Sequence, residues 1–341
     1  MPKKNIFYIL LSFIVSVILI WFLLSQIEIK DLFEIFSKIY YPAFLAFVVI
    51  ALTSALLRAW RYKWLLHPSS ISWGNIFLVT FVRNLFVDLF PARIGSLSYI
   101  YILNRRLNFS FEAATSTFVV SFVFDFLTLS PFLIFSIFFV GLGNTALSSI
   151  SLLVISAIFF FLVFIILWKI TQLSVFMLKI YRLFLKSIRL KEKKWAKVST
   201  EKIRLTIEDI KQIKKRKIYW PIFFLSLGIR LAKYGSLYLL LFSLLKSHGF
   251  SLKTLSFCKT ILGTTGAEMT GALPIKGIAG FGTWESAWAL TFKLMNFEPN
   301  LAIMSGIGIH LITNLFEYFL GIISIIILAF PFIKKAKHIR F

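Results

Sequence analysis

The chain has 341 residues, of which 59% are hydrophobic and 18% aromatic. Soluble domains average about 45 to 50% apolar residues, so this composition excludes an ordinary soluble protein and indicates an integral membrane protein. Lys and Arg number 38 against 14 acidic residues, and the densest part of this excess lies in residues 169–219, between apolar stretches. A basic segment in that position faces anionic lipid headgroups, so we expect no nucleic-acid partner.

Apolar stretches of spanning length recur along the whole chain. We predict six full spans, at residues 6–25, 41–57, 113–140, 150–168, 220–245 and 299–332. Short cytoplasmic loops carry the Lys and Arg excess of a membrane protein. Lys3 and Lys4 precede the first span, and Arg58, Arg61 and Lys63 follow the second, where we interpret them as its cytoplasmic flank. The predicted location is the cytoplasmic (inner) membrane, with several passes and with both termini and residues 169–219 in the cytoplasm.

The pattern of residues 73–108 does not predict a single uninterrupted span. Their apolar run is interrupted by "PARIGS" at residues 91–96, and both ends of the unit lie on the basic side of the predicted topology. Non-helical backbone is tolerated at membrane depth only where protein or a water-filled cavity covers it. We therefore predict a re-entrant helical hairpin that enters from the cytoplasm, with its tip at residues 91–95.

The basic segment at residues 169–219 contains a helical pattern. Lys179, Arg182, Lys186 and Arg189 recur every three or four residues, beside Phe176, Ile180, Leu183 and Phe184. Such a pattern is typical of a helix that lies in the headgroup layer. Anionic lipids at the cytoplasmic face are therefore the expected partner of this segment.

Residues 251–297 repeat the broken-helix theme from the other side. Here an apolar run is interrupted by "LPIKGIAGFGT" at residues 273–283, and neither end carries a basic cluster. Two broken-helix units of opposite orientation are typical of transporters with inverted repeats. We predict an all-α polytopic membrane protein with a single transmembrane domain over residues 1–341, in which about six full spans accompany two re-entrant hairpins in an inverted-repeat arrangement.

The two predicted tips are candidate anion sites. Each tip begins a half-helix whose free N–H groups and positive dipole end attract negative charge. Each also carries a cation, Arg93 in the first and Lys276 in the second. A cation near the bilayer centre costs about 2.5 to 3.5 kcal/mol on insertion scales. A retained one therefore favours function over simple snorkelling to the interface.

Other ionisable residues in apolar stretches are weaker candidates. We expect Asp88 and Asp125 to pair with Arg83, Arg93 or Arg230, although a proton-coupling role stays open. Glu268 and Glu317 have no local cation and are candidates for pairing across the bundle or for protonation. Arg230 and Lys233 lie one turn apart on one helix face. Glu285 falls in the first turn of its helix, where the dipole stabilises a carboxylate, and His310 is expected to be a hydrogen-bonded interior residue.

Several of these stretches resemble a known family. "RAWRYKW" at residues 58–64, "NLFVDLFPARIGS" at residues 84–96, Asp125, and "LPIKGIAGFGTWE" at residues 273–285 are similar to the flippase-like transmembrane family, the family of the lysylphosphatidylglycerol synthase transmembrane domain. The resemblance implies a polytopic bundle that moves a lipid with a polar headgroup between leaflets. Together with the residue-level arguments it gives these candidate substrate-binding residues: Arg93, Lys276, Asp125, Glu285, Arg230, Asn84 and Glu268.

The chain departs from the family pattern at three places. Gly95-Ser96 stands where the family commonly has Gly-Glu, Ser121-Phe122 where it has Glu-Arg, and Trp284-Glu285 where it often has Arg-Glu. Because charges are missing at these places, the headgroup is expected to differ from the family's usual one. The predicted spans also occupy the chain, so we expect no soluble aminoacyl-transferase domain and no lysyl-lipid synthase activity.

Two other classes of function stay open beside a translocase that moves an anionic, aminoacylated or glycosylated lipid. One is a membrane-embedded lipid-modifying enzyme, and the other is an accessory subunit whose basic segment docks a cell-envelope enzyme. The chain has no His-x4-Asp, Asp-x-Asp, His-Glu-x2-His or P-loop motif, so we expect neither enzymatic activity nor intrinsic ATP hydrolysis. Cys258 is the only cysteine, which excludes an intramolecular disulfide, and no metal or other cofactor is expected.

Overall fold

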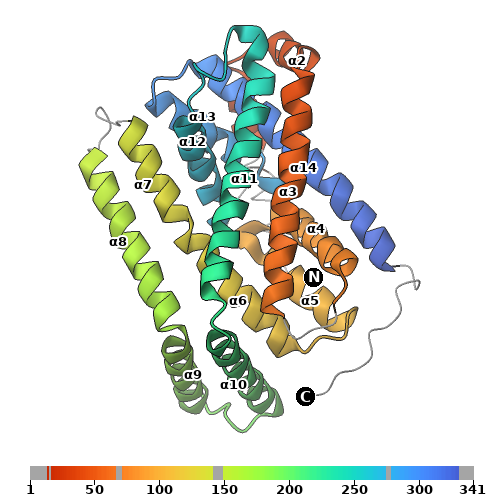
Figure 1. Cartoon of the computed structure of the whole chain (residues 1–341), viewed down its shortest axis with the longest axis vertical. Coiled ribbons are helices and arrows are strands. Elements are labelled where there is room, and N and C mark those ends of the chain that lie inside the picture. Colours follow the sequence, from red (N-terminus) through yellow and green to blue (C-terminus); the bar gives the residue numbers. More distant parts are fainter. Residues whose placement is uncertain (1–13, 15–16, 67–70, 141–148, 274–277, 330–341) are drawn as a thin grey trace.

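The computed structural model of the chain describes residues 14, 17–66, 71–140, 149–273 and 278–329. These residues form thirteen α-helices, α2 to α14, with short 3-10 helices between some of them, and they include no β-strand (Figure 1). Five helical segments are long and apolar enough to cross a membrane: Tyr41–Leu65, Phe111–Val140, Ile150–Trp168, Tyr219–His248 and Pro299–Ala329. The predicted all-α polytopic membrane fold is confirmed. Half of the first predicted span, residues 6–25, lies outside the described residues, and residues 17–24 of it are helical.

Helices α3 (Tyr41–Leu65) and α11 (Tyr219–Leu245) lie side by side along the length of the bundle (Figure 1). Small polar side chains at their interface let the backbones approach closely, and the Ser54 hydroxyl donates to the carbonyl of Ile229 at 3.3 Å. Helix α3 continues eight residues beyond the span end predicted at Leu57. Arg58 and Arg61 therefore lie inside the helix, which corrects their interpretation as a cytoplasmic flank.

The span predicted at residues 113–140 consists of two consecutive helices, α6 (Phe111–Leu127) and α7 (Leu129–Val140). Thr128 separates them, and its hydroxyl donates to the carbonyl of Phe124 at 2.8 Å. Helix α8 (Ser149–Trp168) follows and packs beside α7. Its side chains, such as Phe161, are largely exposed and apolar, as expected for a surface that contacts lipid tails.

The first broken unit consists of α4 (Trp73–Leu89), the 3-10 helix η1 (Pro91–Ser96) and α5 (Leu97–Arg105). A residue before proline is pushed out of the helical region, and Phe90 is accordingly extended, with φ −100° and ψ 141°. Helix α5 turns back and packs against α4. Its nine residues rise only about 13.5 Å, less than half of the roughly 30 Å hydrocarbon core. This length fits a re-entrant hairpin and is too short for a second span.

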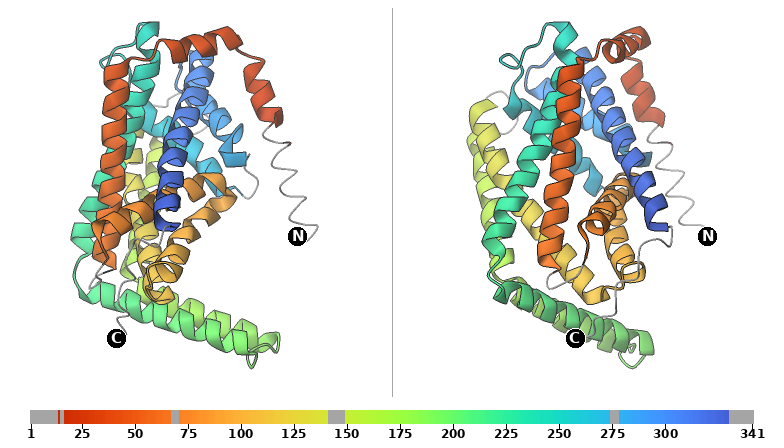
Figure 2. Two further views of the ribbon diagram at one scale, coloured as in Figure 1. Left: turned by 90° about the vertical axis from the view of Figure 1, so that its right-hand side faces the viewer. Right: turned by 45° about the vertical axis from the view of Figure 1, so that its right-hand side comes forward.

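The second broken unit enters from the opposite end of the bundle (Figure 2). It comprises α12 (Phe257–Met269), η3 (Thr270–Ala272), η4 (Ile278–Gly280) and α13 (Thr283–Leu294). Residues 274–277, between η3 and η4, lie outside the described residues. The break of the first unit contacts the breaks of the second, because η1 packs against both η3 and η4. The two interruptions recognised in the sequence thus meet inside the bundle.

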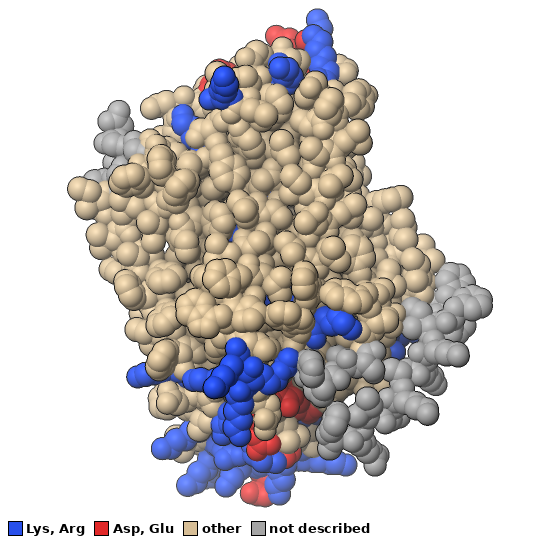
Figure 3. Space-filling view, viewed as in Figure 1, with Lys and Arg blue, Asp and Glu red and all other residues tan. Residues whose placement is uncertain are grey.

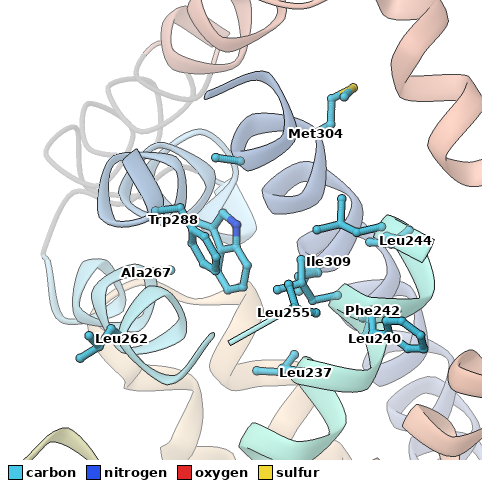
Figure 4. Close-up of a cluster of buried hydrophobic side chains, with 14 of the residues drawn as sticks. Leu237, Leu240, Phe242, Leu244, Leu255, Leu262, Ala267, Trp288, Met304 and Ile309 are labelled. Atoms are coloured by element: carbon cyan, nitrogen blue, oxygen red, sulfur yellow. The ribbon is translucent and has the colours of Figure 1, made fainter. Parts of the chain in front are cut away.

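A hydrophobic cluster fixes the second unit against α14 (Pro299–Ala329) and α11 (Figure 4). Its centre is Trp288 of α13, which is fully buried. Gly306 of α14 allows this contact, since a Cβ there would come within 2.8 Å of the Trp288 ring. Helix α14 is continuous through this contact, and its glycine at position 306 permits the close packing.

Helices α9 (Ile170–Ser187) and α10 (Lys194–Lys215) form a hairpin that lies across one end of the bundle (Figure 2). The apolar residues predicted to face the headgroup layer are each at least half exposed: Phe176, Ile180, Leu183 and Phe184. Figure 3 shows Lys and Arg gathered at this end, below a broad belt with few charges. An exposed surface that is both apolar and basic is suited to an anionic membrane interface.

Gly95 is expected to be essential for the first broken unit. A Cβ at this position would lie 1.7 Å from the carbonyl oxygen of Phe86, and backbone cannot move aside as a flexible side chain can. Gly95→Ala should therefore separate η1 from α4 and destabilise the protein by about 3 kcal/mol, the upper end for overpacking. Thermal unfolding of the detergent-solubilised protein, followed by gel filtration, measures this loss.

Gly235→Ala is the matched control. Gly235 lies inside α11 and has no atom within 4 Å of a Cβ built on it. Alanine is favoured over glycine in a helix by up to about 1 kcal/mol, so this variant should be as stable as the parent or slightly more stable. Equal melting of the Gly95→Ala variant and the parent would contradict the close approach of η1 to α4.

Candidate functional site

A polar cavity of about 250 Å³ lies within the bundle, between α3, α4, α11, α14 and the second broken unit. At roughly 30 Å³ per molecule, such a volume accommodates several waters or a small polar group. The charged residues that line it come from six helices: Arg58, Arg83, Asp88, Asp125, Arg230, Lys233, Glu268 and Glu317. Ionisable residues inside spanning helices mark binding sites and transport pathways. This cavity is therefore the candidate functional site.

Asp125 of α6 is held by Arg61 of α3. The Arg61 Nη1 atom lies 2.6 Å from Asp125 Oδ1, and Nη2 lies 3.3 Å from Oδ2, so the contact is bidentate. Arg61 is fully buried and also donates to the hydroxyl of Ser226 on α11 at 2.8 Å. Asp125 was expected to pair with Arg83, Arg93 or Arg230. Its side-chain partner is instead a residue that the sequence placed outside the span.

Arg230 and Lys233 of α11 face the same side, as their spacing predicted. The Arg230 Nη2 atom donates to the main-chain carbonyl of Asp125 at 2.6 Å, and Nη1 lies 3.8 Å from Glu268 Oε2. Lys233 forms an ion pair with the other carboxylate oxygen of Glu268. The predicted pairing of Glu268 across the bundle is confirmed. These contacts connect α11 to the second broken unit.

Arg58 and Arg83 line the cavity and hold unused donors. The Nε atom of each is buried and has no hydrogen-bond partner among the described residues. Arg83 Nη1 donates to the side-chain oxygen of Asn84 at 3.2 Å, and the two guanidinium groups are close enough to repel one another. A buried donor without a partner costs about 1 to 3 kcal/mol. We call these two residues the arginine pair.

Two further groups complete the lining. Asp88 of α4 and Glu317 of α14 both line the cavity, and their side chains interact. His310 of α14 also lines it and contacts Glu285 of α13, which is almost fully buried behind it, with 2.6 Å between His310 Nδ1 and Glu285 Oε1. Glu285 occupies the first turn of α13, as predicted, and accepts a hydrogen bond from the N–H of Gly282 at 2.8 Å.

The structure places five of the seven candidate residues at this site. Asn84, Asp125, Arg230 and Glu268 line the cavity, and Glu285 lies behind His310. The side chain of Arg93 and the whole of Lys276 lie outside the described residues. The sequence missed Arg58 and Arg61 as site residues. Their spacing of three residues in a helix was the available signal, because it puts both on one face.

Within the described ranges, no cluster of three or more His, Cys, Asp and Glu side chains has the arrangement of a metal site. The cavity is lined instead by charged side chains of both signs, some of which form ion pairs. Such a lining is suited to binding a charged or zwitterionic group.

Comparison with known proteins agrees with the architecture and the motifs. No curated protein matches the chain. The family model described as the lysylphosphatidylglycerol synthase TM region matches residues 9–321, which include the central helices, both broken units and every residue that lines the cavity. The chain therefore belongs to the family of the lysylphosphatidylglycerol synthase TM region, a family associated with membrane lipids.

Proposed function

We propose that the protein is a lipid translocase, which moves a lipid with an anionic headgroup between the two leaflets. The headgroup passes through the polar cavity while the acyl chains stay in the surrounding bilayer. The observation that carries this proposal is the arginine pair: Arg58 and Arg83 hold buried, unpartnered N–H donors in a cavity beside the junction of two oppositely entering broken units.

A phosphate cannot cross the hydrocarbon core at an acceptable cost without a polar path. Burial of an isolated charge costs tens of kcal/mol in a medium of low dielectric constant, more than the 5 to 15 kcal/mol stability of a typical protein. Guanidinium groups match phosphate oxygens with two parallel hydrogen bonds. A phosphate in the cavity would satisfy the free donors of the arginine pair and would itself be stabilised.

Arg93 and Lys276 remain proposed phosphate ligands on the grounds given by the sequence. Each follows a proline at a break between helices, and the two breaks enter from opposite ends of the bundle. The packing of η1 against η3 and η4 supports a shared path, because it joins the two units. In this proposal the tip cations receive the headgroup on its way to or from the arginine pair.

The proposal is tested with purified protein in proteoliposomes that contain a labelled phosphatidylglycerol. Transfer of the label between leaflets without covalent change supports a translocase. A covalently modified lipid would support the lipid-modifying enzyme instead. Label that neither moves nor changes would refute the proposed activity toward this lipid class.

We further propose that the end of the bundle with α9 and α10 faces the cytoplasm, where its basic and apolar surface binds anionic lipids or docks a cell-envelope enzyme. The concentration of Lys and Arg at this end supports the orientation (Figure 3). Reporter fusions at Phe341 and Gly143 should report opposite sides of the membrane. The same side for both fusions would contradict this topology.

A further inference from the structure

Glu285 and His310 form a buried acid–imidazole pair beside the cavity. Both oxygens of the Glu285 carboxylate have a polar partner: Oε2 accepts from the Gly282 N–H at 2.8 Å, and Oε1 lies 2.6 Å from His310 Nδ1. An ionised carboxylate can only accept, so the pairing assigns the imidazole proton to Nδ1. In neutral histidine the other ring nitrogen, Nε2, is then left with a free lone pair.

The other ring nitrogen of His310, Nε2, is not engaged by Glu285. His310 lines the cavity, and among the described residues Nε2 has no hydrogen-bond partner. Gly280 lies beside this edge of the ring, since a Cβ there would be in ordinary van der Waals contact with Nε2, at 3.5 Å. The ring stacks on Trp284, with 4.8 Å between ring centroids and 16° between ring planes. A cation over an aromatic face is stabilised by the ring quadrupole.

We propose that Glu285 and His310 form a proton-binding site, which takes up a proton at His310 Nε2 when an anionic headgroup enters the cavity. This inference rests on the proposed function, because the headgroup is the lipid that the cavity would carry. The proton adds to the lone pair of Nε2 and converts the imidazole to an imidazolium. The Glu285 carboxylate behind the ring and the Trp284 face beside it both stabilise that positive charge.

The surrounding charges explain why proton uptake would depend on the lipid. The cavity that His310 lines also presents cations from three helices: Arg58 from α3, Arg83 from α4, and Arg230 and Lys233 from α11. Their repulsion opposes a further positive charge while the cavity holds no anion. An anionic headgroup on the arginine pair offsets that repulsion and attracts the imidazolium.

The remaining acids are already engaged. Arg61 holds Asp125, Lys233 and Arg230 hold Glu268, and the side chains of Asp88 and Glu317 interact with one another. The carboxylate in direct contact with the imidazole is that of Glu285. Because linkage is reciprocal, a headgroup that favours the imidazolium is itself bound more tightly when His310 is protonated.

The test is a pH titration of the full chain labelled with ¹³C at the histidine Cε1 position. The four histidines give few resonances, and the His310 signal is assigned by its absence in the His310→Gln variant. The titration is made in nanodiscs of phosphatidylcholine and in nanodiscs of phosphatidylcholine mixed with phosphatidylglycerol. The His310 transition should move to higher pH with phosphatidylglycerol by about one unit or more, the effect of an opposite charge within about 4 to 6 Å.

His248 supplies the internal control. It is exposed in the 3-10 helix η2 (Lys246–His248) at the other end of α11 from the basic hairpin, so it reports the general surface potential of an anionic membrane. A shift at His310 that exceeds the shift at His248 supports the proposal. Equal shifts at both residues would overturn it.

The Glu285→Gln variant distinguishes two roles of Glu285, as part of a proton-binding site or only as a cap of its helix. Gln can still accept from the Gly282 N–H, but it has no negative charge. The proposal expects the His310 transition to move to lower pH in this variant, whereas a purely structural Glu285 would leave it unchanged and overturn the proposed pair. The titration needs no movement of lipid between leaflets, so a failure of translocation and a failure of proton uptake are distinguishable.

Discussion

Asp125→Ala is expected to lower the free energy of unfolding by about 3 to 5 kcal/mol, the cost of removing one partner from a buried ion pair. Arg61 is fully buried, and its guanidinium makes its bidentate contact with Asp125. Without that carboxylate, Arg61 becomes a buried charge that has lost its acidic partner, although it still donates to Ser226. Thermal unfolding in detergent, followed by intrinsic fluorescence and gel filtration, measures the loss.

The pair should also show an asymmetry. The Asp125 side chain is 23% exposed toward the cavity while that of Arg61 is 0% exposed, so Arg61→Met should cost less than Asp125→Ala. The double variant Arg61→Met with Asp125→Leu should recover part of the stability, because no buried charge is left.

Arg204→Gln is the control, since Arg204 lies on the exposed face of α10 with Glu201 and Glu208, where ion pairs contribute about 0 to 1 kcal/mol. An Asp125→Ala variant as stable as Arg204→Gln would contradict the structural role of the pair.

The double variant Arg58→Gln with Arg83→Gln is expected to slow lipid translocation at least about a hundredfold. Loss of one member of a desolvated charge pair costs about 2 to 5 kcal/mol, and each 1.4 kcal/mol is a factor of ten in rate. The two arginines have buried donors without partners, so neutral replacements should leave folding intact. The proteoliposome assay with labelled phosphatidylglycerol measures the rate, and gel filtration checks the fold.

Conservative variants test the geometry of the proposed grip. Arg58→Lys with Arg83→Lys keeps both charges but loses the planar fork that binds two phosphate oxygens, so it should be partly active. Arg204→Gln should translocate at the parental rate. In contrast to this control, Arg93→Gln or Lys276→Gln should abolish translocation if the tip cations bind the headgroup. Full activity of the arginine-pair double variant would refute the proposed phosphate site.

The stretches that the sequence predicted best are those in which length and local pattern decide the structure. Residues 150–168 form α8 almost as predicted, because a long uncharged run has no soluble alternative to a spanning helix. The break at residues 91–96 was also found, since Pro91 removes a backbone donor and Phe90 before it becomes extended. Glu285 was correctly placed in the first turn of its helix because it follows the break at residues 273–283, and the helix dipole stabilises a carboxylate there.

The errors arose where a charge lies inside a spanning helix. A span predicted from hydropathy ends at the first charged residues. The span predicted at residues 41–57 therefore ended before Arg58, although α3 continues to Leu65. Nothing local to Arg61 shows that a carboxylate 64 residues later neutralises it. A local sequence pattern therefore could not predict this long-range ion pair.

What the sequence by itself determined is the class of molecule: an all-α membrane protein with two interrupted helices and a basic segment on one side. Those features depend on apolar length, proline positions and the distribution of charge, which are properties of short stretches. Only the tertiary structure decided which charges share the cavity, because that depends on how each helix is rotated about its axis and how deeply it sits. Arg61 against Asp125, Lys233 against Glu268, and His310 against Glu285 are contacts between different helices, fixed by the packing of the bundle around them.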